Sequence, residues 1–320
     1  MLSEENLILE TKQLTKRFKR ARNCSFVACD SVSLKFYKGK TLGLVGESGC
    51  GKSTFMKTIV QMEKAEGEIL FHGKDITKLK GERLRQHRRR IQMIFQDPSA
   101  AFNPKMKIRD IICEPLINYG EIKRKDRDLI AKKYLQMVEL SPEFSDRYPH
   151  HLSGGQRQRI GIARALALEP EIIICDEATS ALDVSVQKSI IELLVKLQKE
   201  KGITMGFICH DINLVGQVSH QIAVMYFGNI VEVIAGRNLK DNAKHPYTKT
   251  LMDSVFYLDM DYKKNMGATG NEVSGLSDFS HGCAFQNRCR VCSEKCRIEK
   301  PKLKRLDEEH YVACHFVSGA

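Results

Sequence analysis

The sequence has no long hydrophobic run. None of the apolar stretches in its 320 residues approaches the roughly 20 residues that a membrane-spanning helix needs. The chain starts Met1-Leu-Ser-Glu-Glu-Asn, with two acids and no basic residue, whereas a secretory signal starts with basic residues and continues with apolar ones. We therefore expect that the chain does not cross a membrane by itself.

Proline and glycine are scarce, at 8 and 22 residues, and no repeat or low-complexity block is present. Hydrophobic residues make up 42% of the chain and charged residues 28%, which is typical of a globular protein with a sizeable core. A wholly disordered chain and tandem copies of one domain are therefore excluded. The length suits one large domain with an appendage, or two modest domains.

Basic residues outnumber acidic ones, 51 against 39, which gives a net charge of +12. The excess is spread over the clusters Lys16–Arg22, Arg83–Arg90 and Lys300–Arg305. Such an excess suits nucleic acid, anionic lipid or nucleotide phosphate as a partner, and it does not choose among them. We interpret the densest cluster, Arg83–Arg90, as a solvated helix face or loop.

Short apolar stretches alternate with helical patterns along most of the chain. Strands are expected at Leu7–Glu10, Ser31–Tyr37, Thr41–Val45, Gly67–Phe71, Ile91–Phe95, Glu171–Cys175, Ile203–Cys209, Ala223–Phe227 and Ile230–Val233. Helices are expected at about Lys52–Met62, Gly155–Ala167 and Asp183–Glu200, and within Ile108–Leu140. This alternation predicts an α/β fold with a mainly parallel sheet core and antiparallel β elements at its start. Residues 259–281 are polar and rich in Gly, Ser and Asn, which predicts a linker.

One Gly-rich segment fits the P-loop pattern and lies between an expected strand and an expected helix. It consists of Gly46, Glu47, Ser48, Gly49, Cys50, Gly51, Lys52, Ser53 and Thr54. Its glycines let backbone N–H groups point inward as a nest for phosphate, and the helix that follows directs its positive end at the same anion. Lys52 supplies a charge to the phosphates, and the Ser53 hydroxyl is placed to bind Mg²⁺. The alternative is a plain Gly-rich turn, but the strand–loop–helix context favours phosphate binding.

A second segment, from Ile172 to Glu177, places two carboxylates after four apolar residues. Such a strand delivers its acids to the carboxyl edge of a parallel sheet, where ligands bind in open α/β folds. Asp176 is the natural Mg²⁺ partner, and Glu177 is placed to orient or deprotonate a water that attacks the γ-phosphate. Alone, the segment also fits a strand that ends in two solvated acids. Its position after the P-loop disfavours that interpretation.

A third segment, Leu152-Ser153-Gly154-Gly155-Gln156, opens a helix just before that acidic strand. Ser153 is expected to cap the helix, while the two glycines expose backbone N–H groups at its start. This arrangement makes a second anion site that does not easily reach the P-loop of its own chain. We therefore expect it to clamp the γ-phosphate that another subunit holds.

The third segment resembles the signature motif of ABC ATPases, and other family motifs follow the same order. Gln96 matches the Q-loop glutamine that contacts Mg²⁺, Ser180-Ala181-Leu182-Asp183 matches the D-loop, and His210 matches the switch histidine at the γ-phosphate. Phe18 is similar to the aromatic residue that stacks on adenine, with Phe26 as a competitor. The resemblance covers about residues 7–254.

The resemblance implies an ABC cassette domain over residues 1–258, with a helical subdomain at about 100–168. It implies two ATP molecules held head-to-tail between two cassettes, with Mg²⁺ bound by Ser53, Gln96 and Asp176. Glu177 and His210 would be catalytic, whereas Asp183 and the Ser153–Gln156 segment would act on the ATP of the partner subunit.

Three further segments resemble the ATP-binding subunits of dipeptide and oligopeptide importers, and the "F" subunit in particular. These segments are Gln96–Met106 followed by Ile111–Leu116, then His245–Leu251, and the Cys-rich residues 282–320. The resemblance implies a second ATPase subunit, two membrane permease subunits and an extracytoplasmic binding protein as partners. It implies a peripheral position on the cytoplasmic face of the membrane. Nickel and metallophore importers share these marks, and a nucleic-acid-handling ABC ATPase is the alternative from another class.

The chain has eleven cysteines, which fall into two groups. Six are scattered, at Cys24, Cys29, Cys50, Cys113, Cys175 and Cys209, and we interpret them as reduced and mostly buried thiols. In the second group, Cys283, Cys289, Cys296 and Cys314 match the C-terminal module of the importer family, which implies a [4Fe–4S] cluster on four thiolates. Zinc is the alternative metal, and Cys292 is a rival ligand.

Overall fold

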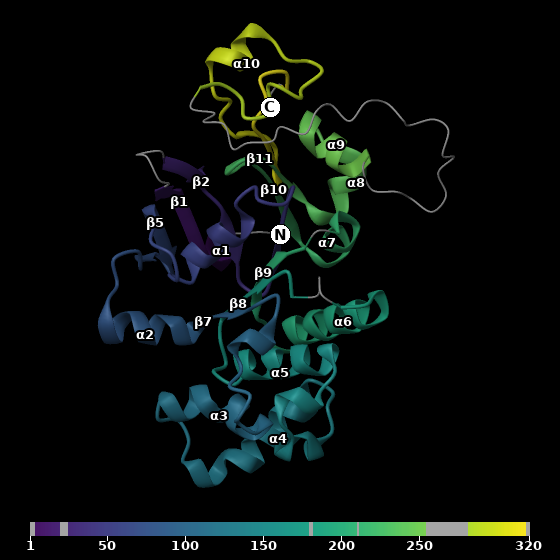
Figure 1. The fold of residues 1–320 in the computed structure, drawn as a ribbon. Coiled ribbons are helices and arrows are strands. Elements are labelled where there is room, and N and C mark those ends of the chain that lie inside the picture. The colour runs from purple at the N-terminus through teal and green to yellow at the C-terminus, as the bar shows by residue number, and fades with distance from the viewer. Residues whose placement is uncertain (1–3, 20–24, 179–181, 210, 254–280, 318–320) are drawn as a thin grey trace.

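The computed structural model describes residues 4–19, 25–178, 182–209, 211–253 and 281–317 (Figure 1). Cys24, Ser180, Ala181 and His210 lie outside the described residues, as does the expected linker at 259–281 apart from its last residue. None of the helices within these ranges is long and apolar enough to cross a bilayer.

The chain forms thirteen strands and ten α-helices within the described ranges. The strands are β1 Leu7–Lys19, β2 Ser25–Val32, β3 Lys35–Tyr37, β4 Thr41–Val45, β5 Glu66–Phe71, β6 Lys74–Asp75, β7 Ile91–Ile94, β8 Ile172–Asp176, β9 Thr204–Ile208, β10 Gln221–Tyr226, β11 Asn229–Ala235, β12 Lys304–Asp307 and β13 His310–Val312. The helices are α1 Lys52–Ile59, α2 Gly81–Arg90, α3 Ile108–Asn118, α4 Arg127–Met137, α5 Gly154–Leu166, α6 Val184–Lys201, α7 Ile212–Val218, α8 Leu239–Asn242, α9 Pro246–Asp253 and α10 Glu294–Ile298.

The main sheet has eight strands in the order β12-β13-β11-β10-β4-β9-β8-β7. The five strands from β10 to β7 are parallel to one another, and β11, β13 and β12 continue the sheet in antiparallel pairs. Every residue of β4, β8, β9 and β10 is buried, as expected for parallel strands covered on both faces. The predicted parallel α/β core is therefore confirmed.

A second, antiparallel sheet is built from β1, β2, β3, β5 and β6 near the N-terminus. The prediction of one strand over Ser31–Tyr37 is wrong, because β2 and β3 pair with different parts of the long strand β1. Thr11 marks the break: its hydroxyl donates to the Val32 carbonyl at 3.2 Å and accepts from the Leu34 N–H at 2.9 Å. Apolar residues alternate on both sides of the break, so the sequence pattern gives no sign that one strand ends and another begins.

Helices α3 and α4 lie below the main sheet in Figure 1, and α5 lies between them and the sheet. The predicted helix over Gly155–Ala167 is confirmed as α5, one residue earlier at each end. The basic cluster Arg83–Arg90 belongs to α2, a helix without buried residues, and three of its arginines pair with carboxylates. This cluster is therefore a solvated helix, as predicted.

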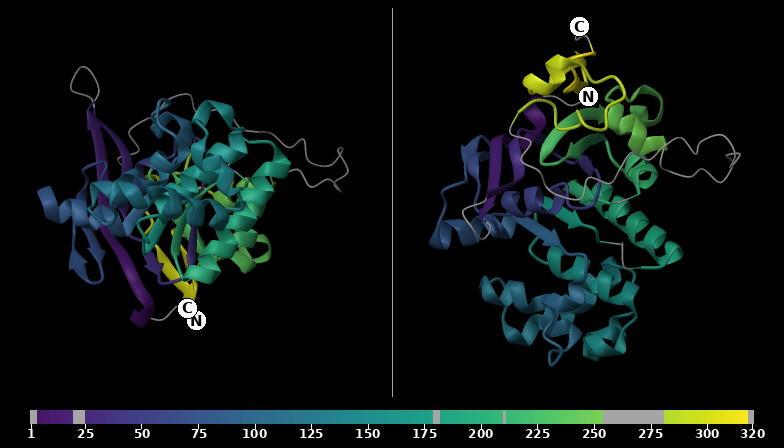
Figure 2. Two further views of the ribbon diagram at one scale, coloured as in Figure 1. Left: turned by 90° about the horizontal axis from the view of Figure 1, so that it is seen from below. Right: turned by 45° about the horizontal axis from the view of Figure 1, so that its top comes forward.

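The C-terminal segment lies at the end of the molecule opposite α3 and α4 (Figures 1 and 2). Its hairpin β12–β13 extends the main sheet, with Glu232 of β11 opposite Val312 and Val233 opposite Tyr311. Phe285 is 2% exposed and belongs to the core cluster of the main sheet. The segment is therefore packed directly onto the sheet that carries the P-loop.

Candidate active site

The carboxyl ends of the parallel strands bring the main motifs to one edge of the sheet. The P-loop follows β4, Asp176 ends β8, and Gln96 follows β7 by two residues. The strand registers fix this arrangement, since Leu44 and Asp176 are both paired with Ile208, and Ile94 is paired with Cys175. This edge is the place where ligands bind in open α/β sheets.

The P-loop passes so close to its neighbours that two of its positions accept only glycine. Gly46 has φ 151°, and a Cβ there would lie 2.1 Å from the Met225 carbonyl oxygen of β10. Gly51 has φ 109°, and a Cβ there would lie 2.0 Å from the Ala28 carbonyl oxygen of β2. Gly51 also precedes α1 as its N-cap without a side-chain hydrogen bond, which leaves the first N–H groups of the helix to an anion.

Lys52 is buried within the P-loop, with 4% of its surface exposed. Its ammonium donates to the carbonyl oxygens of Gly46 at 2.7 Å and Glu47 at 2.9 Å. Burial raises the pKa of the neighbouring Cys50 thiol, an effect that the Lys52 charge opposes. Cys50 is therefore a neutral thiol at pH 7, and its N–H donates to the Glu47 carbonyl at 3.3 Å.

Ser53 and Asp176 meet where α1 starts and β8 ends. The Ser53 hydroxyl donates to Oδ1 of Asp176 at 2.6 Å, and Asp176 is 7% exposed. A hydroxyl and a carboxylate are oxygen ligands of the kind that Mg²⁺ prefers. The pair therefore fits the predicted Mg²⁺ site, whereas the third expected ligand, Gln96, is exposed in the segment after β7.

Glu177 has an unusual backbone conformation for a residue with a long side chain. Its φ is 50°, in the left-handed region, and its N–H donates to the Ile208 carbonyl at 3.1 Å. Such strain persists only where the surrounding structure imposes it, and it is concentrated at functional sites. Seven other non-glycine residues in the described part of the chain also have a positive φ, so this conformation agrees with the predicted catalytic role of Glu177 without identifying it.

The Ser153–Gln156 segment starts α5 with a reciprocal cap. Ser153 Oγ accepts from the Gln156 N–H at 3.3 Å, and Oε1 of Gln156 accepts from the Ser153 N–H at 3.0 Å. The predicted N-cap is confirmed. The Ser-x-x-Gln spacing is the sequence pattern of a capping box, so it also indicates the hydrogen bond from the Ser153 N–H to the Gln156 side chain.

Asp183 caps the neighbouring helix α6, and its Oδ1 accepts from the Ser185 hydroxyl at 2.7 Å and from the Val186 N–H at 3.0 Å. These hydrogen bonds hold the pKa of the Asp183 carboxyl below its usual value. A Cβ on Gly155 would lie 2.5 Å from Cγ1 of Val186, so the starts of α5 and α6 are in close contact. The two segments that the resemblance assigns to the partner's ATP therefore lie together.

Both candidate aromatic residues for adenine lie on the β1–β2 hairpin. Phe18 is paired with Phe26, and their rings are stacked with centroids 6.2 Å apart. The Lys16 ammonium lies 4.5 Å from the centroid of the Phe18 ring. The same hairpin touches the P-loop, where the Cys29 thiol lies 3.7 Å from the Gly51 carbonyl oxygen. The contacts within this chain therefore do not distinguish Phe18 from Phe26 as the residue that would stack on adenine.

Two contacts to the P-loop were missed by sequence reasoning. The Tyr247 hydroxyl accepts from the Glu47 N–H at 2.9 Å, and a guanidinium nitrogen of Arg288 contacts both carboxylate oxygens of Glu47, at 2.8 and 3.0 Å. Tyr247 lies in the singled-out segment His245–Leu251, but no pattern along the chain places it beside a residue 200 positions away. Arg288 lies in the singled-out Cys-rich segment 282–320, but no pattern there indicates a contact with the P-loop.

The C-terminal cysteines lie near one another, although a metal site is not formed. Cys283, Cys296 and Cys314 are buried, and Cys289 and Cys292 are partly exposed. Burial, followed by the nearby thiols of Cys296, Cys289 and Cys314, raises the pKa of Cys283 to about 11. Within the described ranges no three His, Cys, Asp or Glu side chains are arranged to hold a metal ion. The predicted cluster therefore stays a prediction.

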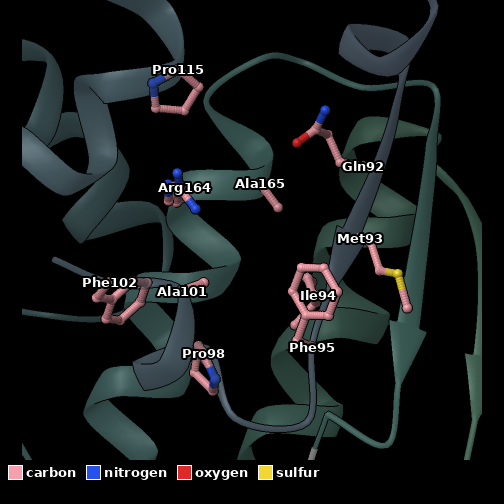
Figure 3. Close-up of a pocket in the computed structure, with 11 residues that line it drawn as sticks. Gln92, Met93, Ile94, Phe95, Pro98, Ala101, Phe102, Pro115, Arg164 and Ala165 are labelled. Atoms are coloured by element: carbon pink, nitrogen blue, oxygen red, sulfur yellow. The ribbon is translucent and has the colours of Figure 1, made fainter. Parts of the chain in front are cut away.

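A hollow of about 120 Å³ lies beside the Q-loop (Figure 3). Its walls come from β7 and the residues after it, from the 3₁₀ helix Pro98–Ala101, and from α3 and α5. Arg164 of α5 lines it and is paired with Glu114 of α3 at 2.8 Å. The segment Gln96–Met106, one of those that resemble importer ATPases, contributes Pro98, Ala101 and Phe102.

Two family descriptions match this chain. Residues 29–180 match the family "ABC transporter", and residues 231–296 match "Oligopeptide/dipeptide transporter, C-terminal region". The first match contains the P-loop, the Ser153–Gln156 segment, Asp176 and Glu177. The second contains the hydrogen-bonding partners Tyr247 and Arg288.

The chain is similar over most of its length to oligopeptide transport ATP-binding proteins. It is 44% identical to AppF of Bacillus subtilis, over 91% of this chain and 90% of the relative. It is 42% identical to OppF of Haemophilus influenzae over 98% of both chains, and 44% identical to OppF of Escherichia coli over 90% of this chain and 87% of the relative.

Among solved structures, the ATP-binding cassette MJ0796, captured as a dimer in a post-hydrolysis state with ADP and Pi, superposes with a TM-score of 0.66. It is 32% identical in sequence, and the match covers 72% of this chain and 99% of that one. The chain therefore belongs to the ABC transporter family, among the ATP-binding ATPase subunits of oligopeptide/dipeptide transporters.

Proposed function

We propose that this chain hydrolyses MgATP to drive the import of peptides through membrane subunits of an ABC transporter. The observation that carries the proposal is the convergence of the P-loop, Asp176 and Glu177 at one sheet edge, in a chain whose C-terminal part matches oligopeptide transporters. Relatives named for oligopeptide transport favour peptides over the nickel alternative.

In the proposed reaction the P-loop N–H groups and Lys52 bind the β- and γ-phosphates, and Ser53 and Asp176 hold Mg²⁺ with Gln96. The bound Mg²⁺ supplies positive charge that offsets the charge developing on the transferred phosphoryl group. Glu177 accepts the proton of the attacking water, and His210 contacts the γ-phosphate. Phe18 stacks on the adenine. Most of the rate enhancement comes from positioning and electrostatics.

A second cassette completes each site in this proposal. Ser153, Gly154, Gly155, Gln156 and Asp183 would contact the ATP bound to the partner's P-loop, which requires a head-to-tail dimer. The close packing of the starts of α5 and α6 supports this assignment, because it presents both segments together. The dimeric cassette MJ0796 with bound ADP and Pi supports the same architecture. We expect the partner to be a related ATPase subunit.

We further propose that the hollow beside the Q-loop receives a segment of a permease subunit. The chain would then lie peripherally on the cytoplasmic face of the membrane and work with two permeases and an extracytoplasmic binding protein. Ala101 is exposed at the rim, so Ala101→Glu adds charge there without opening the core. This variant should keep its ATPase activity in isolation and lose co-purification with the permeases. Unchanged co-purification would contradict the docking proposal.

We also propose that residues 1–258 form the ATPase domain and 282–320 a Cys-rich module, joined by 259–281. Cys283, Cys289, Cys296 and Cys314 would hold a [4Fe–4S] cluster, with zinc as the alternative. Thiolates are ligands that either metal takes, although among the described residues no three of these side chains are arranged around a common point in this structure. Anaerobically purified protein should be brown and contain about four iron atoms per chain. Colourless, iron-free protein would refute the cluster, and about one zinc per chain would establish the alternative.

The decisive test uses the complete transporter in proteoliposomes with its binding protein. Peptide-loaded binding protein should stimulate ATP hydrolysis and drive uptake of labelled peptide. Nickel or a nickel chelate in place of peptide should have no effect. Stimulation by nickel and not by peptide would establish the metal importer, whereas salt-sensitive stimulation by DNA would establish the nucleic-acid alternative.

A further inference from the structure

Glu47 places a carboxylate in a loop that binds anions. Its side chain is 41% exposed and its backbone takes part in the P-loop on both sides. The Glu47 carbonyl accepts from the Lys52 ammonium at 2.9 Å, and the Glu47 N–H donates to Tyr247 at 2.9 Å. An unpaired negative charge at this position would repel the phosphates of a nucleotide.

Arg288 supplies the opposite charge from outside the cassette core. One nitrogen of its guanidinium contacts both oxygens of the Glu47 carboxylate, at 2.8 and 3.0 Å. The guanidinium carbon lies 5.9 Å from the centre of the Tyr226 ring and 5.8 Å from that of Phe285. Its side chain is 27% exposed, so the rings shield the pair partly from solvent. Arg288 is thus held in one orientation toward the P-loop.

The residues that carry Arg288 are anchored to the same part of the cassette. Phe285 packs against Tyr226 and Tyr247 with ring centroids 5.2 and 5.4 Å apart. Tyr247 in turn accepts the hydrogen bond from the Glu47 N–H. The backbone at Cys283 is fixed by a hydrogen bond from its N–H to the Cys296 carbonyl at 2.7 Å. The C-terminal segment therefore acts on Glu47 in two ways. Arg288 contacts the Glu47 carboxylate directly, and Phe285 packs against Tyr247, which accepts from the Glu47 main-chain N–H.

We propose that Arg288 is a positioning residue for nucleotide binding, which neutralises Glu47 and fixes the part of the P-loop that orients Lys52. Because Arg288 belongs to the C-terminal segment, that segment sets the affinity of the cassette for MgATP. The inference rests on ATP binding at the P-loop, as the proposed function does, but it is independent of the transported cargo.

The test measures MgATP affinity of the full-length chain and its steady-state kinetics with the co-expressed transporter subunits. Arg288→Ala should raise the Kd and KM for MgATP about twofold to fivefold, which is the upper part of the range for a partly exposed charge pair. Its kcat should change by less than about twofold, because Arg288 does not touch the reacting atoms. Arg288→Lys, which retains the charge, should recover most of the affinity.

A double-mutant cycle separates neutralisation of Glu47 from a general role in folding. If Arg288 acts through the Glu47 charge, Arg288→Ala should have little effect on Kd in the Glu47→Gln background. The difference between wild type and Arg288→Ala should also shrink at high salt, because one side chain of the pair is well exposed. Arg237→Ala is the matched control, because it removes another arginine–glutamate pair to the C-terminal segment, at Glu309.

An Arg288→Ala chain with wild-type MgATP affinity would overturn the inference. The same would follow if its loss of affinity were equally large in the Glu47→Gln background, or were reproduced by Arg237→Ala. If Arg288→Ala does not fold, Arg288→Lys and Glu47→Gln still test the charge pair. A wild-type chain that binds no MgATP would overturn the proposed function itself, which is a different result.

Discussion

The Ser53 hydroxyl and the Asp176 carboxylate are joined by a 2.6 Å hydrogen bond that links the first turn of α1 to the end of β8. These residues are 123 positions apart, and each belongs to a different motif. Their contact brings two separate sequence patterns together and fits the proposed site for a hydrated divalent cation.

We expect Ser53→Ala and Asp176→Asn each to lower the ATPase rate by about 100-fold, since each removes a ligand of the catalytic cation. The affinity for ATP without Mg²⁺ should be nearly unchanged, because the nest and Lys52 remain. Isothermal titration with and without Mg²⁺ measures both quantities. Equal losses of affinity in both titrations would show that the substitutions damage the P-loop and not the cation site.

Glu177→Gln should lower ATP hydrolysis by about 100- to 10,000-fold, because glutamine does not accept the proton of the attacking water. ATP binding should persist, so ATP-bound dimers should accumulate with a co-expressed partner. Phosphate release and size-exclusion chromatography measure the two effects. Glu192→Gln, at an exposed position on α6, is the matched control. An unaltered hydrolysis rate in Glu177→Gln would refute its assignment as the catalytic base.

Gly46→Ala should abolish ATP binding, since its Cβ would lie 2.1 Å from a main-chain carbonyl oxygen of β10. The loop would have to move, at a cost of about 1–3 kcal/mol in the free energy of unfolding. Gly49→Ala is the control, because it shares a positive φ of 76° but has open space around it. Thermal denaturation and ATP titration should rank Gly46→Ala as much the more damaging change. Equal effects of the two substitutions would show that the damage comes from the positive φ and not from the contact with β10.

Stability should fall as the pH drops from about 6.5 toward 4. Burial lowers the pKa of His245 to about 4, so the unfolded chain binds a proton in this window that the folded chain does not. Between pH 7 and 5 this histidine alone should cost about 2 kcal/mol of unfolding free energy. Glu232 accepts from the main-chain N–H of His245 at 3.0 Å and also lies 2.7 Å from Nε2 of His310, so both side chains belong to the same buried cluster.

Chemical denaturation at several pH values measures this dependence. His245 Nδ1 also accepts from the Tyr247 N–H at 3.1 Å, so a His245→Gln chain can preserve that contact while it removes the titration. The variant should lose stability less steeply between pH 7 and 5 than the wild type. Parallel stability curves for the two chains would rule out His245 as the group responsible.

Much of this site follows from local patterns along the chain. Three motifs are each specified within about ten neighbouring residues: the P-loop, the acids Asp176 and Glu177, and the helix cap at Ser153. Strand ends and helix starts have their own residue requirements, which is why a local pattern is enough. Parallel pairing then brings them to one edge. The sheet core was predictable for the same reason, and the strands expected at Ala223–Phe227 and Ile230–Val233 correspond to the antiparallel pair β10 and β11.

Contacts between distant parts of the chain were not predictable in this way. The break between β2 and β3 depends on Thr11, which lies in another strand. Likewise, Glu47 meets Tyr247 and Arg288 only because α9 and the C-terminal segment pack beside the P-loop. Such pairs are decided by tertiary packing, and a single sequence carries no periodic signal for them.

Strand β12 is one outer edge of the main sheet, and its exposed Lys304 and Arg305 place two charges along that edge. Charged residues, lysine in particular, discourage another chain from adding to an open sheet. Without β12 and β13 the edge would be β11, whose last five residues are buried and mostly apolar. We therefore expect the C-terminal hairpin to protect the ATPase from aggregation, and a chain truncated before it to self-associate through β11.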